Sequence, residues 1–217
     1  MDYQQSRAYI RDAEQYAGGA LDLTNIKEIM KRLGNPQDQL KYVHVAGTNG
    51  KGSVIAYLYT TLTNAGYHVG RYISPSVYSY REKIEVEGTP ISREQFAKHT
   101  TRVAAVIEEM TAEGLAHPTP FEIETAVAFL FFAEEKCDPV ILEVGMGGIT
   151  DATNLIRTTE LAVLVPISMD HQSFLATRSQ RSRRKKPASW GGGQTRLQRG
   201  NDRTGTGGTE GHRERKS

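Results

Sequence analysis

The feature that most constrains the fold of this chain is a glycine-rich turn between a predicted strand and a predicted helix. The turn reads Gly47-Thr48-Asn49-Gly50-Lys51-Gly52-Ser53. It follows a short apolar run with two valines at residues 42–46, and it precedes residues 53–65, whose apolar side chains recur at helical spacing. This order of strand, turn and helix is the setting in which such loops bind phosphate.

The residue types in the turn suit a nucleotide triphosphate. Glycines let backbone N–H groups point at phosphate oxygens, and the start of the helix adds partial positive charge. Lys51 is expected to reach the β- and γ-phosphates, and the Ser53 hydroxyl to approach Mg²⁺. The motif departs from a standard Walker A because Val45, and not glycine, stands five positions before Gly50. The alternative, a glycine turn with a chance lysine, is disfavoured by the strand and helix on either side.

The rest of the pattern predicts an α/β fold with a mainly parallel sheet flanked by helices. Apolar runs at 69–73, 83–86, 140–144 and 161–167 predict further strands, and the last two are of the kind found in a sheet covered on both faces. Helices are expected around 10–17, 25–33 and 92–107, and from Pro120 through 137. Ser92 begins its helix with a capping box, because Gln95 follows three residues later. Alternating strands and helices are typical of a phosphate-loop domain.

Composition limits the setting of the protein. The N-terminus lacks a basic start followed by an apolar run, so no signal peptide is expected. No apolar stretch approaches the ~18 residues of a membrane span. Cys137 is the single cysteine and cannot form an internal disulfide, which fits a reducing, cytoplasmic location.

Charge divides the chain near Leu175. Residues 176–217 carry twelve Lys and Arg against three acidic residues, whereas the preceding residues carry fifteen basic and twenty-two acidic ones. The tail lacks Val, Ile, Phe and Tyr and holds eight of the twenty-one glycines. Such a segment cannot bury enough apolar surface to offset the entropy of ordering. We therefore expect two parts, an ATP-binding domain over 1–175 and a basic, disordered tail over 176–217.

Five segments, in order, resemble folylpolyglutamate and dihydrofolate synthases, which belong to the wider family of ATP-dependent amide ligases that includes the Mur cell-wall ligases. The segments are His44-Val45-Ala46 with the turn already described; Tyr72-Ile73-Ser74-Pro75 with Arg81-Glu82-Lys83-Ile84; Thr119-Pro120-Phe121-Glu122; Glu143-Val144-Gly145-Met146-Gly147-Gly148 with Asp151-Ala152-Thr153-Asn154; and Ser168-Met169-Asp170-His171. Two departures are mild: Ile149 stands where many members carry a basic residue, and Ser76 replaces the usual His.

The resemblance implies addition of L-glutamate to the glutamyl tail of a (tetrahydro)folate. ATP would phosphorylate a substrate carboxylate, and the amine of glutamate would attack the acyl phosphate. Since phosphoryl transfer depends mostly on positioning and on charge neutralisation, a loop, a lysine and Mg²⁺ suffice. Lys51 and His171 are the expected catalytic residues. ATP and Mg²⁺ are the expected cofactors, folate and glutamate the substrates, and a monomer the expected state.

The same resemblance assigns the metal and folate residues. Oxygen ligands suit Mg²⁺, which selects Ser53, Ser74 and Glu143, with His171 at a second metal because the family uses this histidine so. The folate residues would be Phe121, Glu122, Thr150, Asp151 and Ala152, because an aromatic ring can stack on a pterin and an acid can pair with its amino-pyrimidine edge. Simpler roles stay open: Glu143 as a salt-bridged acid, His171 as a hydrogen-bonded loop residue and Phe121 as core.

The tail is interpreted as the product of a shifted reading frame. If each codon is read as the last base of the preceding codon plus the first two of its own, permitted codons turn residues 176–190 into Gly-Asp-Thr-Ile-Ala-Glu-Ile-Ala-Ala-Glu-Lys-Ala-Gly-Ile-Met. That string resembles the family segment that follows the Asp-His motif and includes its metal-site lysine. The domain would then be an incomplete Mur-ligase central ATPase domain, and this copy would be truncated and inactive.

Three rival interpretations remain open. A Mur-type ligase would add an amino acid to a cell-wall nucleotide precursor, although Mur loops usually place Thr at the position of Gly52. A fragment without turnover would keep only nucleotide binding. A true basic tail would bind nucleic acid or an anionic membrane. The last is disfavoured, and no such partner is expected, because Trp190 is the sole aromatic residue of the tail and no helical periodicity offers a binding face.

Overall fold

Two apolar strands form the centre of a sheet that the sequence pattern anticipates. The computed structural model describes residues 1–17, 22–145, 148–168 and 195–198. Strand β1 (Tyr42–Ala46) pairs in parallel with β5 (Val140–Glu143) on one side and β6 (Thr159–Leu164) on the other. Every residue of β1 and β5 is buried, as expected of strands with helices on both faces.

The sheet has seven strands in the order β4-β3-β2-β5-β1-β6-β7. Strand β2 (Gly70–Tyr72) pairs in parallel with β5, whereas β3 (Ile84–Val86) and β4 (Thr89–Pro90) add an antiparallel hairpin beyond it. The expected class, a mainly parallel α/β sheet flanked by helices, is therefore confirmed.

One strand lies within the segment that the sequence analysis expects to be disordered. The tail over 176–217 is predicted to lack structure, yet β7 (Thr195–Gln198) pairs in parallel with β6. A free strand edge offers a row of unpaired N–H and C=O groups that a short extended segment can match through its backbone alone. Composition, which reports side chains, does not reveal such pairing. The other residues of the tail, and His171, lie outside the described residues.

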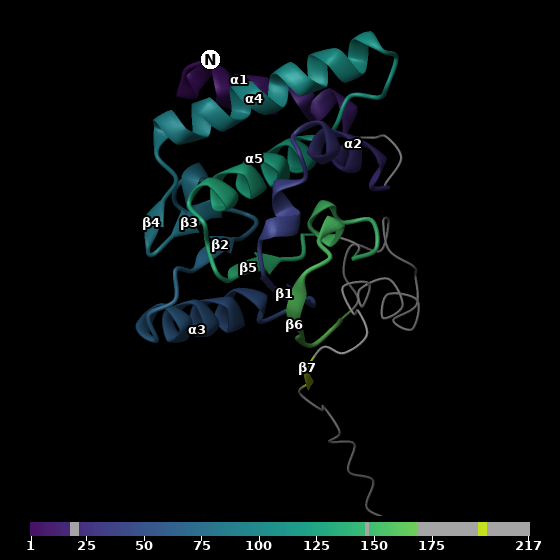
Figure 1. Ribbon diagram of the computed structural model, residues 1–217. Helices are drawn as coiled ribbons and strands as arrows, with labels where there is room; N and C mark the ends of the chain where they lie inside the picture. The colour runs from purple at the N-terminus through teal and green to yellow at the C-terminus, as the bar shows by residue number, and fades with distance from the viewer. Residues whose placement is uncertain (18–21, 146–147, 169–194, 199–217) are drawn as a thin grey trace, which may run out of the picture.

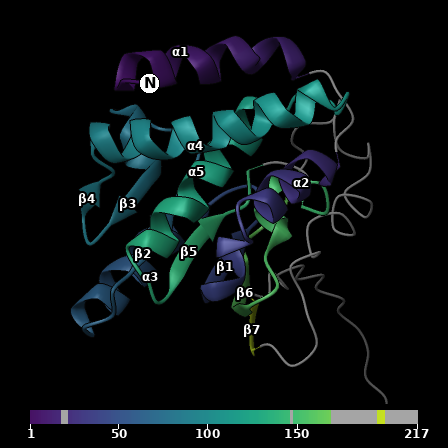
Figure 2. The same cartoon turned by 45° about the horizontal axis from the view of Figure 1, so that its top comes forward.

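The helices divide between the two faces of the sheet (Figure 1). Helix α3 (Lys51–Asn64) covers one face, and α1 (Tyr3–Asp12), α2 (Thr24–Arg32), α4 (Arg93–Ala112) and α5 (Pro120–Glu134) cover the other. In the tilted view of Figure 2, α1 lies over α4 and α5 lies beneath α4, next to the sheet. The short 3₁₀ turns are Ala13–Tyr16, Pro36–Gln39, Tyr80–Lys83 and Ala152–Leu155.

Strand alternation explains the two cores. Successive side chains of a strand point to opposite faces. Accordingly, Tyr42 and Leu142 pack in the core beneath α5, whereas Val43, Val45 and Ile141 pack in a smaller core beneath α3. Most of α5 is buried, as its Ala-, Phe- and Leu-rich sequence predicts.

Local capping fixes where the long helices begin. The expected capping box of Ser92 with Gln95 is present, and Thr119 forms a second with Glu122 directly before Pro120. Among the described helices, none combines the length and the apolar character needed to cross a membrane.

Candidate functional site

The glycine-rich turn leaves β1 and enters α3 against the segment that follows β6. Gly47 has φ +148°, and a methyl group there would lie 2.2 Å from Val165 Cγ2 and 2.7 Å from the Val165 carbonyl oxygen. The Thr48 N–H donates to the Pro166 carbonyl at 2.9 Å. Glycine is thus required at position 47 by both backbone conformation and space. The turn is held by a neighbour far away in the sequence.

The outer side of the turn is open. Gly50 precedes the first turn of α3 with φ +89°, and a Cβ at Gly50 or Gly52 would meet no atom within 4 Å. No side chain caps this helix start. Its backbone N–H groups therefore face a space that an anion can fill. Ser53 lies exposed in the same first turn, as its expected role near a metal requires.

Lys51 closes over the turn and reaches the next strand. Its Nζ donates to the carbonyls of Gly47 at 3.3 Å and Thr48 at 3.4 Å, and it lies 3.5 Å from Glu143 Oε1. The side chain is only 16% exposed. The lysine is thus positioned directly above the turn that would hold phosphates.

Glu143 connects the turn to a second region. It ends β5 in register with Val45 of β1, and its Oε2 accepts the Ser74 N–H at 3.1 Å. Burial raises the pKa of Glu143, and the Ser74 N–H and the Lys51 ammonium lower it in part. Lys51, Ser74 and Glu143, predicted separately from three segments, therefore meet.

The oxygen atoms of these side chains are of the type that binds a magnesium ion. A buried carboxylate with incomplete compensation and the hydroxyls of Ser53 and Ser74 are oxygen ligands, which Mg²⁺ prefers alongside phosphate oxygens. Within the described ranges, no group of three or more His, Cys, Asp or Glu side chains is placed to hold a metal. A cation here would thus depend on nucleotide oxygens as well as on protein.

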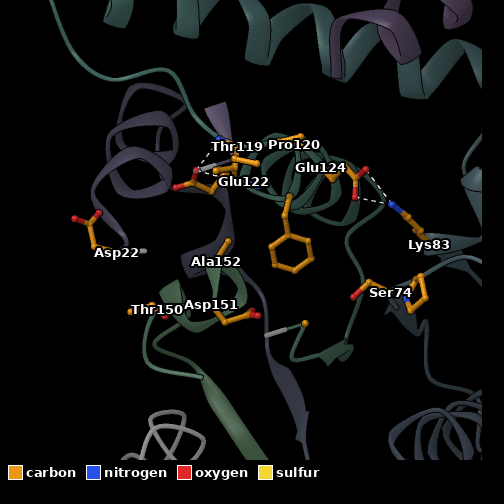
Figure 3. A pocket seen from close by; sticks show the side chains of 14 residues that line it. Asp22, Ser74, Lys83, Thr119, Pro120, Glu122, Glu124, Thr150, Asp151 and Ala152 are labelled. Atoms are coloured by element: carbon orange, nitrogen blue, oxygen red, sulfur yellow. Dashed lines mark hydrogen bonds and ion pairs between the residues drawn. The ribbon is translucent and has the colours of Figure 1, made fainter. Parts of the chain in front are cut away.

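A pocket of about 480 Å³ lies beside this cluster (Figure 3). It is lined by all five predicted folate residues, namely Phe121, Glu122, Thr150, Asp151 and Ala152. Ser74, whose N–H binds Glu143, also lines it. Two sites predicted from separate motifs are therefore neighbours that share one residue.

The ring of Phe121 belongs to the pocket as well as to the core edge. It is partly exposed and stacks near Tyr72, with centroids 6.1 Å apart at 26°. A methyl group at Gly145 would lie 2.8 Å from Phe121 Cζ and 3.1 Å from Asp151 Oδ2. Gly145 thus lets an aromatic edge and a carboxylate approach the same spot.

Glu122 has a local role that its motif did not reveal. Its Oε2 accepts the Thr119 N–H at 2.8 Å and the Thr119 hydroxyl at 2.9 Å. The side chain therefore stabilises the start of α5 while it lines the pocket.

Sequence reasoning missed an ion pair on the pocket wall. Lys83 Nζ lies 2.8 Å from Glu124 Oε2 and 3.0 Å from Oε1, and the Tyr80 hydroxyl donates to the same carboxylate. Figure 3 shows Lys83 and Glu124 facing each other at one end of the pocket. Lys83 stood within a recognised segment without a role. Glu124 gave no signal, because it lies inside an apolar helix.

Known proteins resemble this chain in sequence and in structure. No protein-family model matches the chain. The chain is 40% identical over 174 residues to the dihydrofolate synthase/folylpolyglutamate synthase of Bacillus subtilis, covering 80% of this chain and 40% of that protein. It is 35% identical over 176 residues to the folylpolyglutamate synthase of Lacticaseibacillus casei, covering 81% and 41%.

This chain is a homologue of the folylpolyglutamate and dihydrofolate synthases. A solved FPGS–AMPPCP–folate complex superposes with a TM-score of 0.84 at 33% identity, covering 90% of this chain and 48% of that chain. An Escherichia coli structure in complex with DHPP and ADP gives 0.73 at 31% identity, covering 83% and 42%. The chain thus spans about 40% of the length of these two bacterial relatives.

Proposed function

We propose that this chain is the nucleotide- and folate-binding part of an ATP-dependent ligase that adds L-glutamate to a folate. One observation carries the proposal: Glu143 contacts Lys51 of the phosphate-binding turn on one side and Ser74 of the 480 Å³ pocket on the other. A phosphate donor in the turn and a carboxylate substrate extending from the pocket would meet at this residue. The relatives solved with AMPPCP and folate, and with ADP, support both ligands.

The residues divide the first chemical step among them. The backbone of residues 47–53 would hold the β- and γ-phosphates, and Lys51 would leave its carbonyl partners to neutralise the charge of the transferred group. Ser53, Ser74 and Glu143 would hold Mg²⁺, which supplies further charge neutralisation at the phosphates. His171 keeps its assignment to a second metal on the family resemblance alone.

The proposed reaction first converts the substrate carboxylate into an acyl phosphate. A carboxylate oxygen of the folate attacks the γ-phosphorus, and the bond from that phosphorus to the bridging oxygen of ADP breaks. The glutamate amine then attacks the acyl carbon, loses a proton and releases inorganic phosphate, leaving an amide. Activation is needed because a carboxylate by itself is a poor electrophile.

The pocket would hold the pterin end of the folate. Phe121 offers an aromatic face, Glu122 and Asp151 offer acids for the amino-pyrimidine edge, and Thr150 and Ala152 complete the wall. A monomeric, cytoplasmic enzyme without nucleic-acid or membrane partners belongs to the same proposal.

Binding measurements test the proposal without requiring turnover. Calorimetric titration of the 217-residue chain with magnesium ATP should give saturable binding. Lys51→Ala should weaken it about tenfold to a hundredfold, because hydrogen bonds from a charged donor contribute about 1.5–3 kcal/mol. Lys31→Ala is the matched control, since that lysine is 72% exposed and pairs with Glu28 of its own helix. Equal affinities of wild type and Lys51→Ala would refute the nucleotide site.

Turnover separates the candidate functions. Phosphate release that requires both tetrahydrofolate and glutamate supports the ligase, whereas release that requires a cell-wall nucleotide precursor supports a Mur-type enzyme. Binding of ATP without turnover supports the second candidate, a nucleotide-binding fragment.

We also propose that the reading frame shifts near the codon of Leu175. The alignments to the two bacterial relatives cover 80–81% of the chain, in keeping with a change of sequence character there. Resequencing the gene around this codon tests the idea. An unbroken frame through residues 176–217 would refute it.

A further inference from the structure

A buried polar chain runs from β1 to the wall of the pocket. His44 lies on β1 three residues before Gly47 and is 1% exposed, and its Nε2 is 2.9 Å from Thr153 Oγ1. Thr153 is fully buried, and its hydroxyl bonds to Asp151 Oδ1, which also accepts the Thr153 N–H at 3.0 Å. Asp151 in turn lines the pocket.

Hydrogen-bond chemistry fixes the direction of this chain. An ionised carboxylate only accepts, so the Thr153 hydroxyl gives its single proton to Asp151 and must accept from His44. Nε2 of His44 therefore carries the hydrogen, and Nδ1 carries the lone pair. Burial lowers the pKa of His44 to about 4, which keeps the ring neutral and in one tautomer near neutral pH.

Stability alone does not account for this histidine. Among the described residues Nδ1 has no hydrogen-bond partner, and a buried polar atom left so is destabilising. The residues around it on the same face, Tyr42 and Leu142, are core side chains, and an apolar residue would suit the position. Packing therefore does not by itself explain an imidazole at this position.

The hydrogen bonds from Thr153 determine where the Asp151 carboxylate points. Thr153 binds Oδ1 twice, which turns Oδ2 toward Gly145 and Phe121, where a Gly145 Cβ would be 3.1 Å from it and 2.8 Å from Phe121 Cζ. In Figure 3 Asp151 lies on the wall opposite Thr119 and Glu122. A flat heterocycle stacked on Phe121 would present its edge N–H groups to Oδ2.

We propose that His44 is a positioning residue for folate: through Thr153 it orients Asp151 so that Oδ2 accepts hydrogen bonds from the amino-pyrimidine edge. The inference rests on the proposed function, because it takes the pocket to be the pterin site. It assigns to His44, on the strand that leads into the phosphate turn, an effect on the other substrate. ATP affinity should therefore be insensitive to it.

Paired substitutions at His44 and Thr153 test this series of hydrogen bonds. Titration with folic acid should show affinity about tenfold weaker for His44→Leu and for Thr153→Val, which remove the donor and the relay. His44→Gln, whose amide can replace Nε2–H, and Thr153→Ser, which keeps the hydroxyl, should bind within about threefold of wild type. Magnesium ATP should bind all four variants as it binds wild type. Urea midpoints identify any variant that fails to fold, and the Thr153 pair then decides.

The outcomes separate this inference from the proposed function. If wild type binds folic acid and His44→Leu and Thr153→Val bind it equally well, the positioning role is refuted and the pocket assignment stands. Parallel losses of folate and ATP affinity would mean a structural role only, which also refutes it. If wild type binds no folic acid, the pocket assignment itself fails.

A spectroscopic measurement tests the direction of these hydrogen bonds in the absence of ligand. The imidazole ¹⁵N chemical shifts of His44 should show a protonated Nε2 and a bare Nδ1 at neutral pH, and Thr153→Val should change them. A protonated Nδ1 in wild type would reverse the deduced direction and overturn the inference.

Discussion

Three glycines of the glycine-rich turn allow a graded test of its packing. Gly47 has both a glycine-only conformation, at φ +148°, and no room for a methyl group. Gly50 has φ +89° with open space, and Gly52 lies in the first turn of α3 with open space and no positive φ. Alanine therefore adds backbone strain and a clash at position 47, backbone strain alone at position 50, and neither at position 52.

The expected effects differ in sign. Gly47→Ala should cost about 2–6 kcal/mol, because a glycine-only backbone and an overpacked site each cost about 1–3 kcal/mol. The Val165 side chain can move, but its carbonyl oxygen, 2.7 Å from the added carbon, belongs to the backbone. Gly50→Ala should cost about 1 kcal/mol from left-handed strain. Gly52→Ala should stabilise by up to about 1 kcal/mol, because alanine is the better helix former.

Urea unfolding of the 217-residue chain, followed by circular dichroism and extrapolated linearly, measures all three. Since domains are stable by only about 5–15 kcal/mol, Gly47→Ala should lose a large part of the total. If Gly47→Ala were no less stable than Gly50→Ala, the turn would not be packed against Val165 as described. The slope of the unfolding curve should stay constant across the series.

Further predictions concern protonation, capping and thiol access. Burial lowers the pKa of His44 and His99 from 6.5 to about 4, so the unfolded chain takes up protons first as the pH falls. The free energy of unfolding should be at its maximum above pH 6.5 and should decline by about 3 kcal/mol per histidine down to about pH 4. His99→Phe should flatten this pH dependence, measured by urea unfolding at several pH values, and an unchanged curve would contradict the lowered pKa of His99. Thr119→Ala should cost about 1 kcal/mol in urea unfolding through the lost cap of α5, and Thr119→Ser little; equal losses would contradict the capping role. Burial raises the pKa of Cys137 to about 12, so a thiol reagent should label it only as the chain unfolds, and rapid labelling of the folded chain would contradict its placement.

The sequence predicted those features that depend on neighbours along the chain. The glycine-rich turn between strand and helix, the capping box of Ser92, the buried helix after Pro120 and the covered strands all follow from local period and residue type. Motif resemblance then named Phe121 and the other four residues that meet around the pocket.

Contacts between distant segments were beyond such reasoning. His44 and Thr153 are 109 positions apart, and no periodicity relates them. Lys83 and Glu124 meet across 41 positions, with the acid inside an apolar helix. The edge pairing of β7 depends on backbone groups, which composition does not report. These features became visible only when the strands were placed side by side.

The anchoring of the glycine-rich turn would couple folding of the chain to binding of the proposed nucleotide. Thr48 and Ser168 bond to each other across 120 positions, and the turn also rests on the backbone after β6. The binding surface thus exists only once the central strands have come together. A ligand that recognises only this assembled surface shifts the folding equilibrium toward it by mass action. ATP would then stabilise the folded chain, and its cellular concentration would influence how much of this chain survives proteolysis.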